Sequence, residues 1–352
     1  MSHLNVTPEC ATFLAGSSLH QACITSSVYF AFSADNMVKQ VAVAAAIITR
    51  TDGSFLLGQR AADTVYPGYW EFPGGKVEAG ETPRQALVRE LSEELGIVVD
   101  AAWPWLMREH HYEHAHVRLY FFEVPYLPDE WHGELQAHVH AAMAWQQPGR
   151  LEVGPMLPAN GPILKALNLP RVMAVTHASE IGIDQQLAAL DHALVQGVRC
   201  VQVREPDMQV AQRDAFAREV SQRCHAHGAM AFFNGDPVDA ARLGMDGVHL
   251  PAAQLAGLTE RPSLEWVGAS CHTRAELEHA ARLGLDYAVL GAVKPTASHP
   301  GQEAIGWQAF SDMTSDLSIP VMAIGGLAAA DMVEARQAGA HGIACIRAAW
   351  KE

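Results

Sequence analysis

Eight short apolar runs in the second half of the chain limit its fold more than any other feature. The runs alternate with Ala-rich stretches of helical character after residue 170. They are RVMAV, CVQV, MAFF, GVHL, WVGAS, YAVLG, VMAIGG and GIACI. Buried strands that alternate with helices are typical of parallel sheets with crossover helices. Eight such units predict an α/β (β/α)8 TIM barrel over residues 169–352.

The first half of the chain mixes strands and helices without this alternation. An apolar, β-branched segment at 41–48 and the segment SFLLGQR at 54–60 flank the turn TRTDG, so a hairpin is predicted. Further strands, and a loop followed by a terminal helix, are predicted at 116–124, 141–145 and 157–167. We therefore expect an α+β domain over residues 37–168.

One helix of this domain has clear boundary signals. It is predicted from about Thr82 to Leu95, with Pro83 in its first turn, where a missing N–H costs nothing. Gly96 follows its last residue, where a left-handed conformation ends many helices.

Residues 1–36 precede the first predicted strand. This segment is mildly apolar but lacks the positively charged start of a signal peptide. We expect a disordered extension or an upstream start codon, so the sequence leaves open whether Met1 or Met37 is the true start.

Composition restricts the partners. The 352 residues include 24 Lys and Arg against 39 Asp and Glu, a net charge of −15 that argues against a nucleic-acid polymer. An acidic protein can still bind a small phosphate compound through a divalent cation. The six scattered cysteines indicate a reducing compartment, and we expect the cytoplasm. No apolar run reaches the ~18 residues of a membrane span, and the oligomeric state stays open.

Three carboxylates crowd the predicted helix. Glu90, Glu93 and Glu94 have i, i+3 and i+4 spacing, which places them on one face. Such a cluster suits Mg2+, with Mn2+ as a substitute, and magnesium suits polyphosphate substrates. The alternative is a solvated acidic face. Ion pairs of Arg89 with Glu78 or Glu81 are expected to pin helix and loop.

The residues around this cluster resemble the Nudix box: Gly75, five residues, Glu81, seven residues, then RELSEELGI. The longer stretch QRAADTVYPGYWEFPGGKVEAGE is similar to Nudix hydrolases of the MutT type, over about 37–167. The resemblance implies a Mg2+-dependent pyrophosphohydrolase that converts 8-oxo-dGTP to 8-oxo-dGMP and pyrophosphate in nucleotide-pool sanitation. It implies that Arg89, Glu90, Glu93 and Glu94 are catalytic, that Gly74, Glu90, Glu93 and Glu94 bind metal, and that Arg60, Glu71, Phe72, Pro73, Gly74 and Asn160 bind the nucleotide.

Two details of this half stay open. The MutT type carries a further acidic ligand between its last strands, but LQAHVHAAMAW offers only His138 and His140. A histidine or water completes the metal shell, or a glutamate of the box is the catalytic base. The segment REHHYEHAH, with His110, His111, His114 and His116, fits an exposed polar strand and loop better than a zinc site.

The second half resembles the thiamine phosphate synthase and TenI family over about 171–350, through VQVRE, GVHLP, SCHT, DYAVLGAVKPT and IPVMAIGG. Gly325, Gly326 and Arg347 are placed to cradle a phosphate at the ends of the last two strands.

Several synthase positions differ, however. Pro206 replaces a lysine, Asn234-Gly235 replaces an Asn-Asp metal-binding pair, and both HLPAAQ and the ASH after KPT lack expected residues. We therefore expect no synthase activity. His272 matches the histidine that TenI proteins use for proton transfer in thiazole tautomerisation, or it is a polar strand-end residue without chemistry. Arg204 and Lys294 are anion contacts or ordinary ion pairs.

Three hypotheses follow. The first is the nucleotide pyrophosphohydrolase with a barrel of altered function. The second is a Nudix hydrolase of thiamine-related pyrophosphates, which the fusion of the two halves motivates. The third treats the barrel as a non-catalytic sensor of a small phosphate ligand that regulates the hydrolase.

Overall fold

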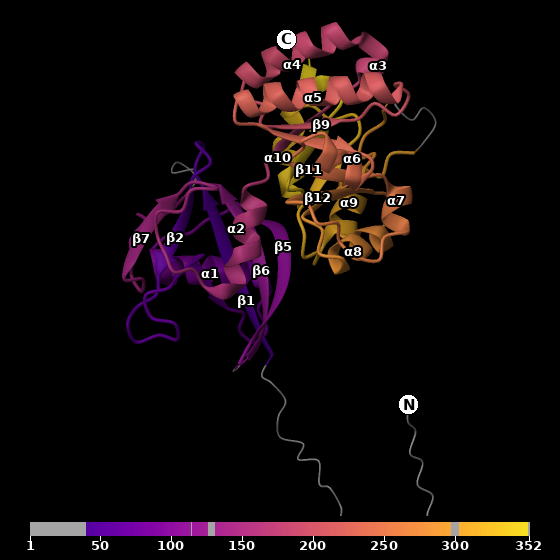
Figure 1. The fold of residues 1–352 in the computed structure, drawn as a ribbon. Helices are drawn as coiled ribbons and strands as arrows, with labels where there is room; N and C mark the ends of the chain where they lie inside the picture. The colour runs from indigo at the N-terminus through magenta and orange to yellow at the C-terminus, as the bar shows by residue number, and fades with distance from the viewer. Residues whose placement is uncertain (1–39, 114, 126–130, 297–302, 351–352) are drawn as a thin grey trace, which may run out of the picture. The chain divides into compact units, whose positions relative to one another are not determined.

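The computed structural model describes residues 40–113, 115–125, 131–296 and 303–350 (Figure 1). The expectation for residues 1–36 therefore lies outside the described residues.

The first domain is built on a seven-stranded mixed sheet. Its strands are β1 (Gln40–Thr49), β2 (Phe55–Gln59), β3 (Trp70–Glu71), β4 (Gly74–Lys76), β5 (Trp103–Tyr112), β6 (Ala115–Pro125) and β7 (Ala142–Gln146). The order is β3-β2-β1-β6-β5, with β4 also on β1 and β7 also on β2. Strands β1 and β6 pair in parallel along ten residues, from Gln40↔His116 to Thr49↔Pro125, and the other paired strands described in this sheet are antiparallel. The expected α+β fold and the strands β1, β2, β6 and β7 are confirmed.

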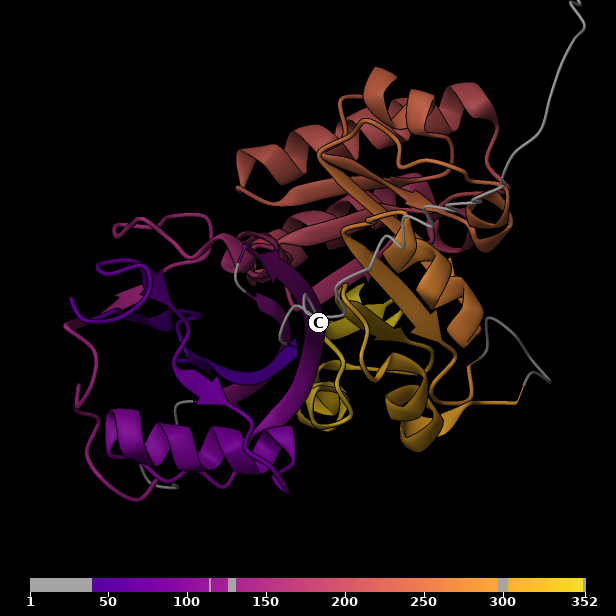
Figure 2. The same cartoon turned by 90° about the horizontal axis from the view of Figure 1, so that it is seen from below.

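Two helices cover opposite faces of this sheet (Figures 1 and 2). Ala44, Ala46 and Ile48 of β1 pack with the apolar face of α1 (Pro83–Leu95). The alternate side chains of β1 pack with α2 (Gly161–Leu167), which follows a 3-10 turn at Pro158–Asn160. This period of two is what a strand buried on both faces requires. Helix α1 is therefore fixed against the sheet that carries the glycine-rich strand β4.

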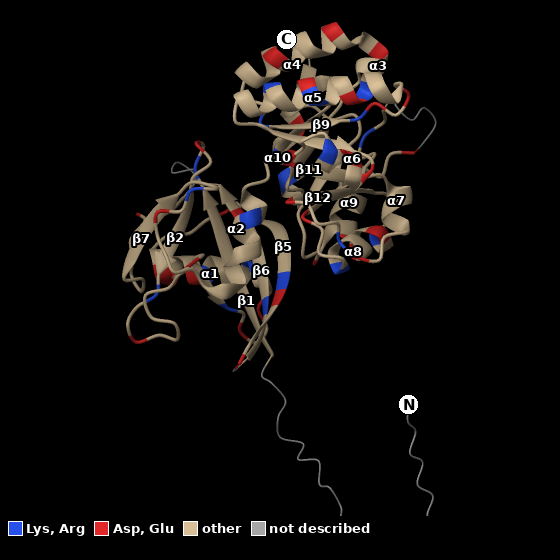
Figure 3. Cartoon of the chain, viewed as in Figure 1, with Lys and Arg blue, Asp and Glu red and all other residues tan. Residues whose placement is uncertain are grey.

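The ends of α1 follow the sequence signals. Thr82 and Gln85 form a capping box, Pro83 occupies the first turn, and Gly96 has φ 70 after Leu95. These features stabilise the orphan backbone groups at both helix ends. The acidic positions of α1 are coloured red in Figure 3.

The second domain is a closed barrel of eight parallel strands, as expected. The strands are β8 (Val172–Val175), β9 (Cys200–Val203), β10 (Met230–Asn234), β11 (Gly247–Leu250), β12 (Trp266–Cys271), β13 (Tyr287–Gly291), β14 (Val321–Ile324) and β15 (Gly342–Cys345). The helices between them are α3 (Ala178–Ile181), α4 (Ile183–Val195), α5 (Val210–Ala226), α6 (Pro237–Arg242), α7 (Ala252–Ala256), α8 (Arg274–Arg282), α9 (Gly306–Thr314) and α10 (Met332–Gln337). Among the described residues, no helix has the length and apolar character needed to cross a bilayer.

The barrel has an inner core of large side chains. The Phe232 and Tyr287 rings stack inside it with centroids 5.6 Å apart, and neither side chain is exposed. Gly268 on β12 provides the space for Tyr287, because a Cβ atom at Gly268 would lie 2.1 Å from the tyrosine Cζ. A glycine is therefore required at this position by close packing across β12 and β13.

A buried carboxylate links residues of the two domains. Glu123 on β6 is 1% exposed and forms ion pairs with Arg171, directly before β8, and with Arg336 on α10. His341 contributes to the same cluster, because the Arg171 guanidinium donates to its carbonyl oxygen at 2.8 Å, and its Nε2 donates to the Leu169 carbonyl at 2.7 Å. A buried charge with two cationic partners is far less costly than one left unpaired.

Gly268→Ala should destabilise the barrel. The added methyl group overpacks a site where the neighbouring ring cannot move away, which typically costs about 1–3 kcal/mol. Urea denaturation followed by tryptophan fluorescence measures this loss. Gly257→Ala is the control, because Gly257 has φ −93 and its Cβ atom would be 3.9 Å from the nearest atom. Equal stability of the two variants would contradict the packing argument.

Candidate functional site

The carboxylate of Glu94 joins α1 to the glycine-rich strand β4. Its Oε2 accepts a hydrogen bond of 2.9 Å from the backbone N–H of Gly74. Gly74 has φ 141, and a Cβ atom there would lie 2.1 Å from the carbonyl oxygen of Ala44. Only glycine fits this position, so the close approach of backbone to carboxylate depends on it.

Burial makes the carboxyl of Glu94 a much weaker acid than an ordinary glutamate. Desolvation raises the pKa of its carboxyl to about 8, although the Gly74 N–H lowers it. The nearby carboxylates of Glu71 and Glu90 raise the pKa further, and Arg60 lowers it. Strongly perturbed pKa values of this kind are concentrated at functional sites.

Arg89 supplies the positive charge among the carboxylates. Its guanidinium pairs with both oxygens of Glu81, at 2.9 and 3.0 Å. It also reaches Glu90 at 2.9 Å and Glu93 at 3.3 Å. A further bond of 3.0 Å to the Lys76 carbonyl ties the helix to the end of β4. The structure thus selects Glu81, of the two partners considered for Arg89, as the residue that pins loop and helix.

The carboxylate oxygens of Glu90, Glu93 and Glu94 are the kind of ligand that a hard divalent cation prefers. Glu90 lies against Gly75, where a Cβ atom would be 2.2 Å from its carboxylate, so the absence of a side chain admits it to the loop. Glu93 has 60% of its side chain exposed. In the described part of the chain, no three His, Cys, Asp or Glu side chains are already gathered as a cation site. Glu90, Glu93 and Glu94 would hold Mg2+ by converging on it from one helix face.

The two histidines near the expected acidic ligand have different surroundings. The His140 ring fills the space beside Gly58, and in the described part of the chain its buried Nδ1 has no hydrogen-bond partner. Burial, followed by the charge of Arg60, lowers the pKa of His140, so the ring stays neutral. The Nδ1 of His138 is 3.3 Å from the carbonyl oxygen of Glu93. A neutral imidazole can serve as a metal ligand, so His140 keeps the expectation of a histidine ligand open.

The residues expected to bind nucleotide differ in how far their side chains are exposed. Arg60 and Glu71 form a two-bond ion pair of 2.7 and 2.6 Å, and burial raises the pKa of Glu71. Asn160 is 4% exposed, and its buried Nδ2 has no hydrogen-bond partner among the described residues. Phe72 is 4% exposed, and its ring packs between Phe55 and Phe121 in the core. The nucleotide contact of Phe72 stays a prediction, and its backbone would make it.

Pro73 also acts through its backbone. Its carbonyl oxygen accepts a 2.8 Å hydrogen bond from the Ala46 N–H, which fastens the segment before Gly74 to strand β1.

The histidine-rich segment forms parts of β5 and β6. The His111 and His116 rings stack with centroids 4.0 Å apart, and His116 Nε2 is 3.3 Å from Glu109. His110 packs on Tyr112 with a centroid distance of 4.4 Å. His114 lies outside the described residues. These contacts suit the expected polar strand.

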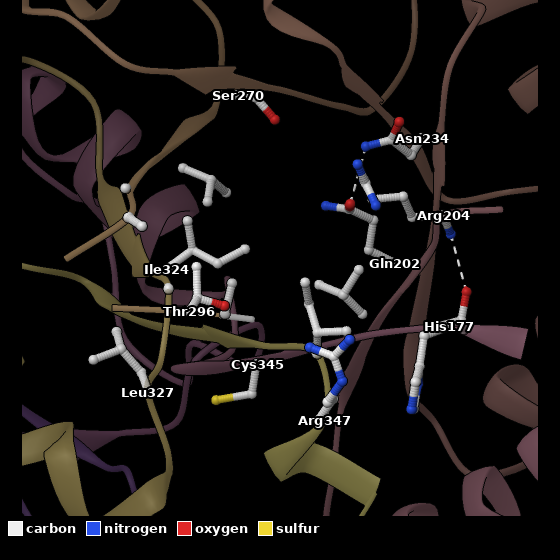
Figure 4. Close-up of a pocket in the computed structure, with 18 of the residues that line it drawn as sticks. His177, Gln202, Arg204, Asn234, Ser270, Thr296, Ile324, Leu327, Cys345 and Arg347 are labelled. Atoms are coloured by element: carbon white, nitrogen blue, oxygen red, sulfur yellow. Dashed lines mark hydrogen bonds between the residues drawn. The ribbon is translucent and has the colours of Figure 1, made fainter. Parts of the chain in front are cut away.

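The barrel contains a cavity of about 830 Å3 at the carboxyl ends of its strands (Figure 4). Polar side chains from successive strands line it, among them Gln202, Asn234, Ser270, His272 and Arg347. The cavity therefore lies where barrel enzymes place their sites. It is a second candidate site, separate from the carboxylates of α1.

A buried hydrogen-bond chain, which the sequence did not reveal, leads to this cavity. His249 contacts the Tyr287 hydroxyl at 3.1 Å through Nδ1 and the Ser270 hydroxyl at 2.8 Å through Nε2. The pKa of His249 is lowered to about 3. Burial is the larger cause, and the positive charge of Arg204 is the second. The neutral ring joins the barrel core to a hydroxyl that lines the cavity. His249 lies in the sequence motif GVHLP and Ser270 in the motif SCHT. Neither motif indicates that these two side chains are in contact.

His272 has a defined tautomer. Its Nδ1 is 3.3 Å from the Gly291 carbonyl, which can only accept, so Nδ1 carries the proton. Nε2 is then the basic atom, as proton transfer by His272 would require.

Arg347 and the glycines before it occupy the cavity wall. Arg347 pairs with both oxygens of Glu180 at 2.9 Å. Cβ atoms at Gly325 and Gly326 would lie 2.5 Å from Ala292 and from the Pro295 carbonyl. The glycines are thus required by a neighbouring loop whether or not a phosphate binds. Lys294 pairs with Asp331 at 2.8 Å, as the ion-pair alternative for this residue expects.

Comparisons with known proteins match the two halves separately. The family model described as NUDIX domain matches residues 38–167, and that described as Thiamine monophosphate synthase matches residues 172–349. The CTP pyrophosphohydrolase of Escherichia coli K12 is 43% identical over 129 residues, which are 37% of this chain and 92% of that relative. The thiamine-phosphate synthase of Chromobacterium violaceum is 36% identical over 183 residues, 50% of this chain and 88% of that relative. The solution structure of the Escherichia coli ORF135 protein, 43% identical, covers 36% of this chain and 88% of its own, with a TM-score of 0.32.

Acid should destabilise the barrel through His249. The folded pKa of about 3 is below the ordinary 6.5, so between these values the unfolded chain binds a proton that the folded chain does not. The stability is complete above pH 6.5 and falls as the pH drops towards 3, by about 1.4 kcal/mol per pH unit for this residue. Buried His341, whose pKa is also lowered, adds to the slope.

Urea denaturation between pH 7.5 and 5 measures the slope. His249→Gln should make the fall in unfolding free energy shallower, whereas His192→Gln, at an exposed position on α4, should leave it unchanged. Parallel slopes in parent and His249→Gln would show that His249 is not held neutral.

Proposed function

The chain belongs to the NUDIX family over residues 38–167 and to the thiamine monophosphate synthase family over residues 172–349, and we propose that it is a Mg2+-dependent nucleoside triphosphate pyrophosphohydrolase. The hydrogen bond from Gly74 to the buried Glu94 carries this proposal, because it fixes an acidic helix face beside a glycine-rich loop. The four described cysteines are unpaired, which fits the cytoplasm.

The chemistry divides between the loop and the helix. Bound Mg2+ would neutralise the charge that develops on a triphosphate, and Mn2+ would substitute for it. Glu90, Glu93 and Glu94 supply its oxygen ligands, together with the backbone of Gly74. One carboxylate of this set takes the proton of a water that attacks the β-phosphorus. The products are a nucleoside monophosphate and pyrophosphate.

Our preferred substrate is 8-oxo-dGTP. Asn160 supports it, because a buried amide Nδ2 without a partner is costly until a ligand acceptor satisfies it. A site built to hydrogen-bond its substrate discriminates strongly against analogues that lack the matching group. The relative that hydrolyses CTP makes cytidine triphosphate the first competitor to compare. An oxidised-purine preference would place the protein in nucleotide-pool sanitation and mutation avoidance.

Thiamine-related pyrophosphates are the alternative substrates of the same site. The barrel supports this alternative, since fused domains often serve one pathway. The carboxylates would act on these compounds in the same way, so substrate comparison separates the two hypotheses.

For the barrel we infer a non-catalytic role as a sensor of a small phosphate ligand. The cavity of about 830 Å3 supports binding, with Arg347, Gly325 and Gly326 at its wall. Pro206 and Gly235 stand where a synthase has a cation and a metal ligand, which weighs against pyrophosphate chemistry. The cavity would take a heterocycle with one phosphate group.

Glu94→Gln should lower kcat by about 10²-fold or more, because an amide cannot ionise and therefore cannot supply the anionic oxygen that a divalent cation or a water proton requires. The Gly74 N–H still has an acceptor, so thermal stability should be retained. Pyrophosphate release with Mg2+ measures the effect. Glu78→Gln is the matched control at an exposed position and should stay active. Near-parental turnover by Glu94→Gln would contradict the metal-ligand assignment.

A thiazole phosphate should raise the melting temperature of the barrel by mass action. At a concentration of 100 Kd the added stability is about 2.7 kcal/mol. Arg347→Gln should abolish most of the shift, and Arg282→Gln, whose side chain is 67% exposed on α8, should not. No shift in the parent at high ligand concentration would refute the sensor hypothesis.

A further inference from the structure

An aromatic cluster next to the carboxylates has no role in the function proposed so far. Tyr66 lies in the segment between β2 and β3, and its ring is 5.3 Å from that of Tyr69. It is 5.9 Å from the ring of Tyr112, at the end of β5. All three tyrosines are half-buried.

Arg60 organises the segment that carries Tyr66. Its Nε donates to the Val65 carbonyl at 2.7 Å, and its backbone exchanges hydrogen bonds of 2.9 and 3.0 Å with Tyr69 and Gly68. The guanidinium also pairs with Glu71. Arg60 is thus a positioning residue, because its hydrogen bonds fix the conformation of the segment 61–69.

Tyr66 has a strained backbone. Its φ of 59 is in the left-handed region, where a bulky side chain is uncommon. Such strain persists only where the surroundings fix it, and it is concentrated at ligand sites. The hydrogen bonds around Arg60 provide that support.

Tyr112 connects the cluster to the buried amide. Its hydroxyl is hydrogen-bonded to the backbone of Ala159, the neighbour of Asn160. Glu71 and Arg60 are close enough to influence the pKa of Tyr112, which burial raises. Glu71 and Arg60 also influence Glu94, so the cluster and the carboxylates belong to one region.

We propose that Tyr66 and Tyr112 form the surface on which the base of the nucleotide stacks, with Asn160 at the edge of that base. Aromatic faces bind any base, because every base has a π face, whereas an amide distinguishes the groups on its edge. The orphaned Nδ2 of Asn160 is the independent sign that a ligand completes this region. The proposal rests on the proposed function, since it assumes a nucleotide substrate.

The test compares Tyr66→Leu and Tyr112→Leu with Tyr66→Phe and Tyr112→Phe in the full chain. The Leu variants should raise KM for 8-oxo-dGTP, dGTP and CTP by about tenfold, because stacking is lost. Hydrolysis of inorganic tripolyphosphate, which has no base, should not change. The Phe variants should behave like the parent, and Tyr120→Leu on β6 is the matched control.

Asn160→Ala provides the contrast, because it should change the ratio between 8-oxo-dGTP and dGTP, whereas the Leu variants should weaken both equally. Calorimetric binding of dGMP to each variant gives a readout independent of turnover. Unchanged KM and dGMP affinity in both Leu variants of an active enzyme would overturn the stacking surface and leave the hydrolase intact. A parent that binds dGMP through the tyrosines without hydrolysing nucleotides would refute only the proposed function. A parent that does neither would refute both.

Discussion

The hydrogen bond from the Gly74 N–H to the buried carboxylate of Glu94 is the contact on which the first domain's chemistry depends. It requires glycine at position 74, since a Cβ atom would collide with strand β1. It also requires α1 to lie flat on the sheet, which Ala44, Ala46 and Ile48 allow through their packing. The loop, the strand and the helix are thereby held in one geometry. The guanidinium of Arg89 pairs with Glu81 and Glu90, and its positive charge offsets the negative charge that this geometry gathers.

The barrel meets a different constraint. A closed parallel sheet directs all its strand ends to one rim, so side chains distant in sequence converge there. The interior below that rim is filled by Phe232 and Tyr287, and a neutral His249 connects this core to the cavity. Pro206, His272 and Arg347 are among the residues that line the cavity. Under the sensor role proposed above, Arg347 would bind a small anion there.

The sequence predicted the features that repeat or that require glycine, proline or charge. The eight barrel strands and the ends of α1 follow from local patterns, whereas the sequence left Glu78 and Glu81 open as partners of Arg89 and the structure has Glu81. The position of the Phe72 ring did not, because a glycine-rich loop gives no sign of which face its neighbours take. Contacts between distant segments were also beyond prediction: Tyr66 meets Tyr112, and Arg347 meets Glu180, only after the chain has folded. The sequence VYPGYW contains Tyr66 and Tyr69, but nothing in this segment indicates that Tyr112 is the partner of Tyr66.

The most direct test of this account is a comparison of product formation with Mg2+ from 8-oxo-dGTP, CTP and oxidised thiamine pyrophosphate. Phosphorus NMR identifies the products, and EDTA removes the metal. We predict one pyrophosphate per nucleoside monophosphate, loss of turnover with EDTA, and the highest kcat/KM for 8-oxo-dGTP. Preference for the thiamine compound would assign both halves to one vitamin pathway, and metal-independent turnover would contradict the role of the carboxylates.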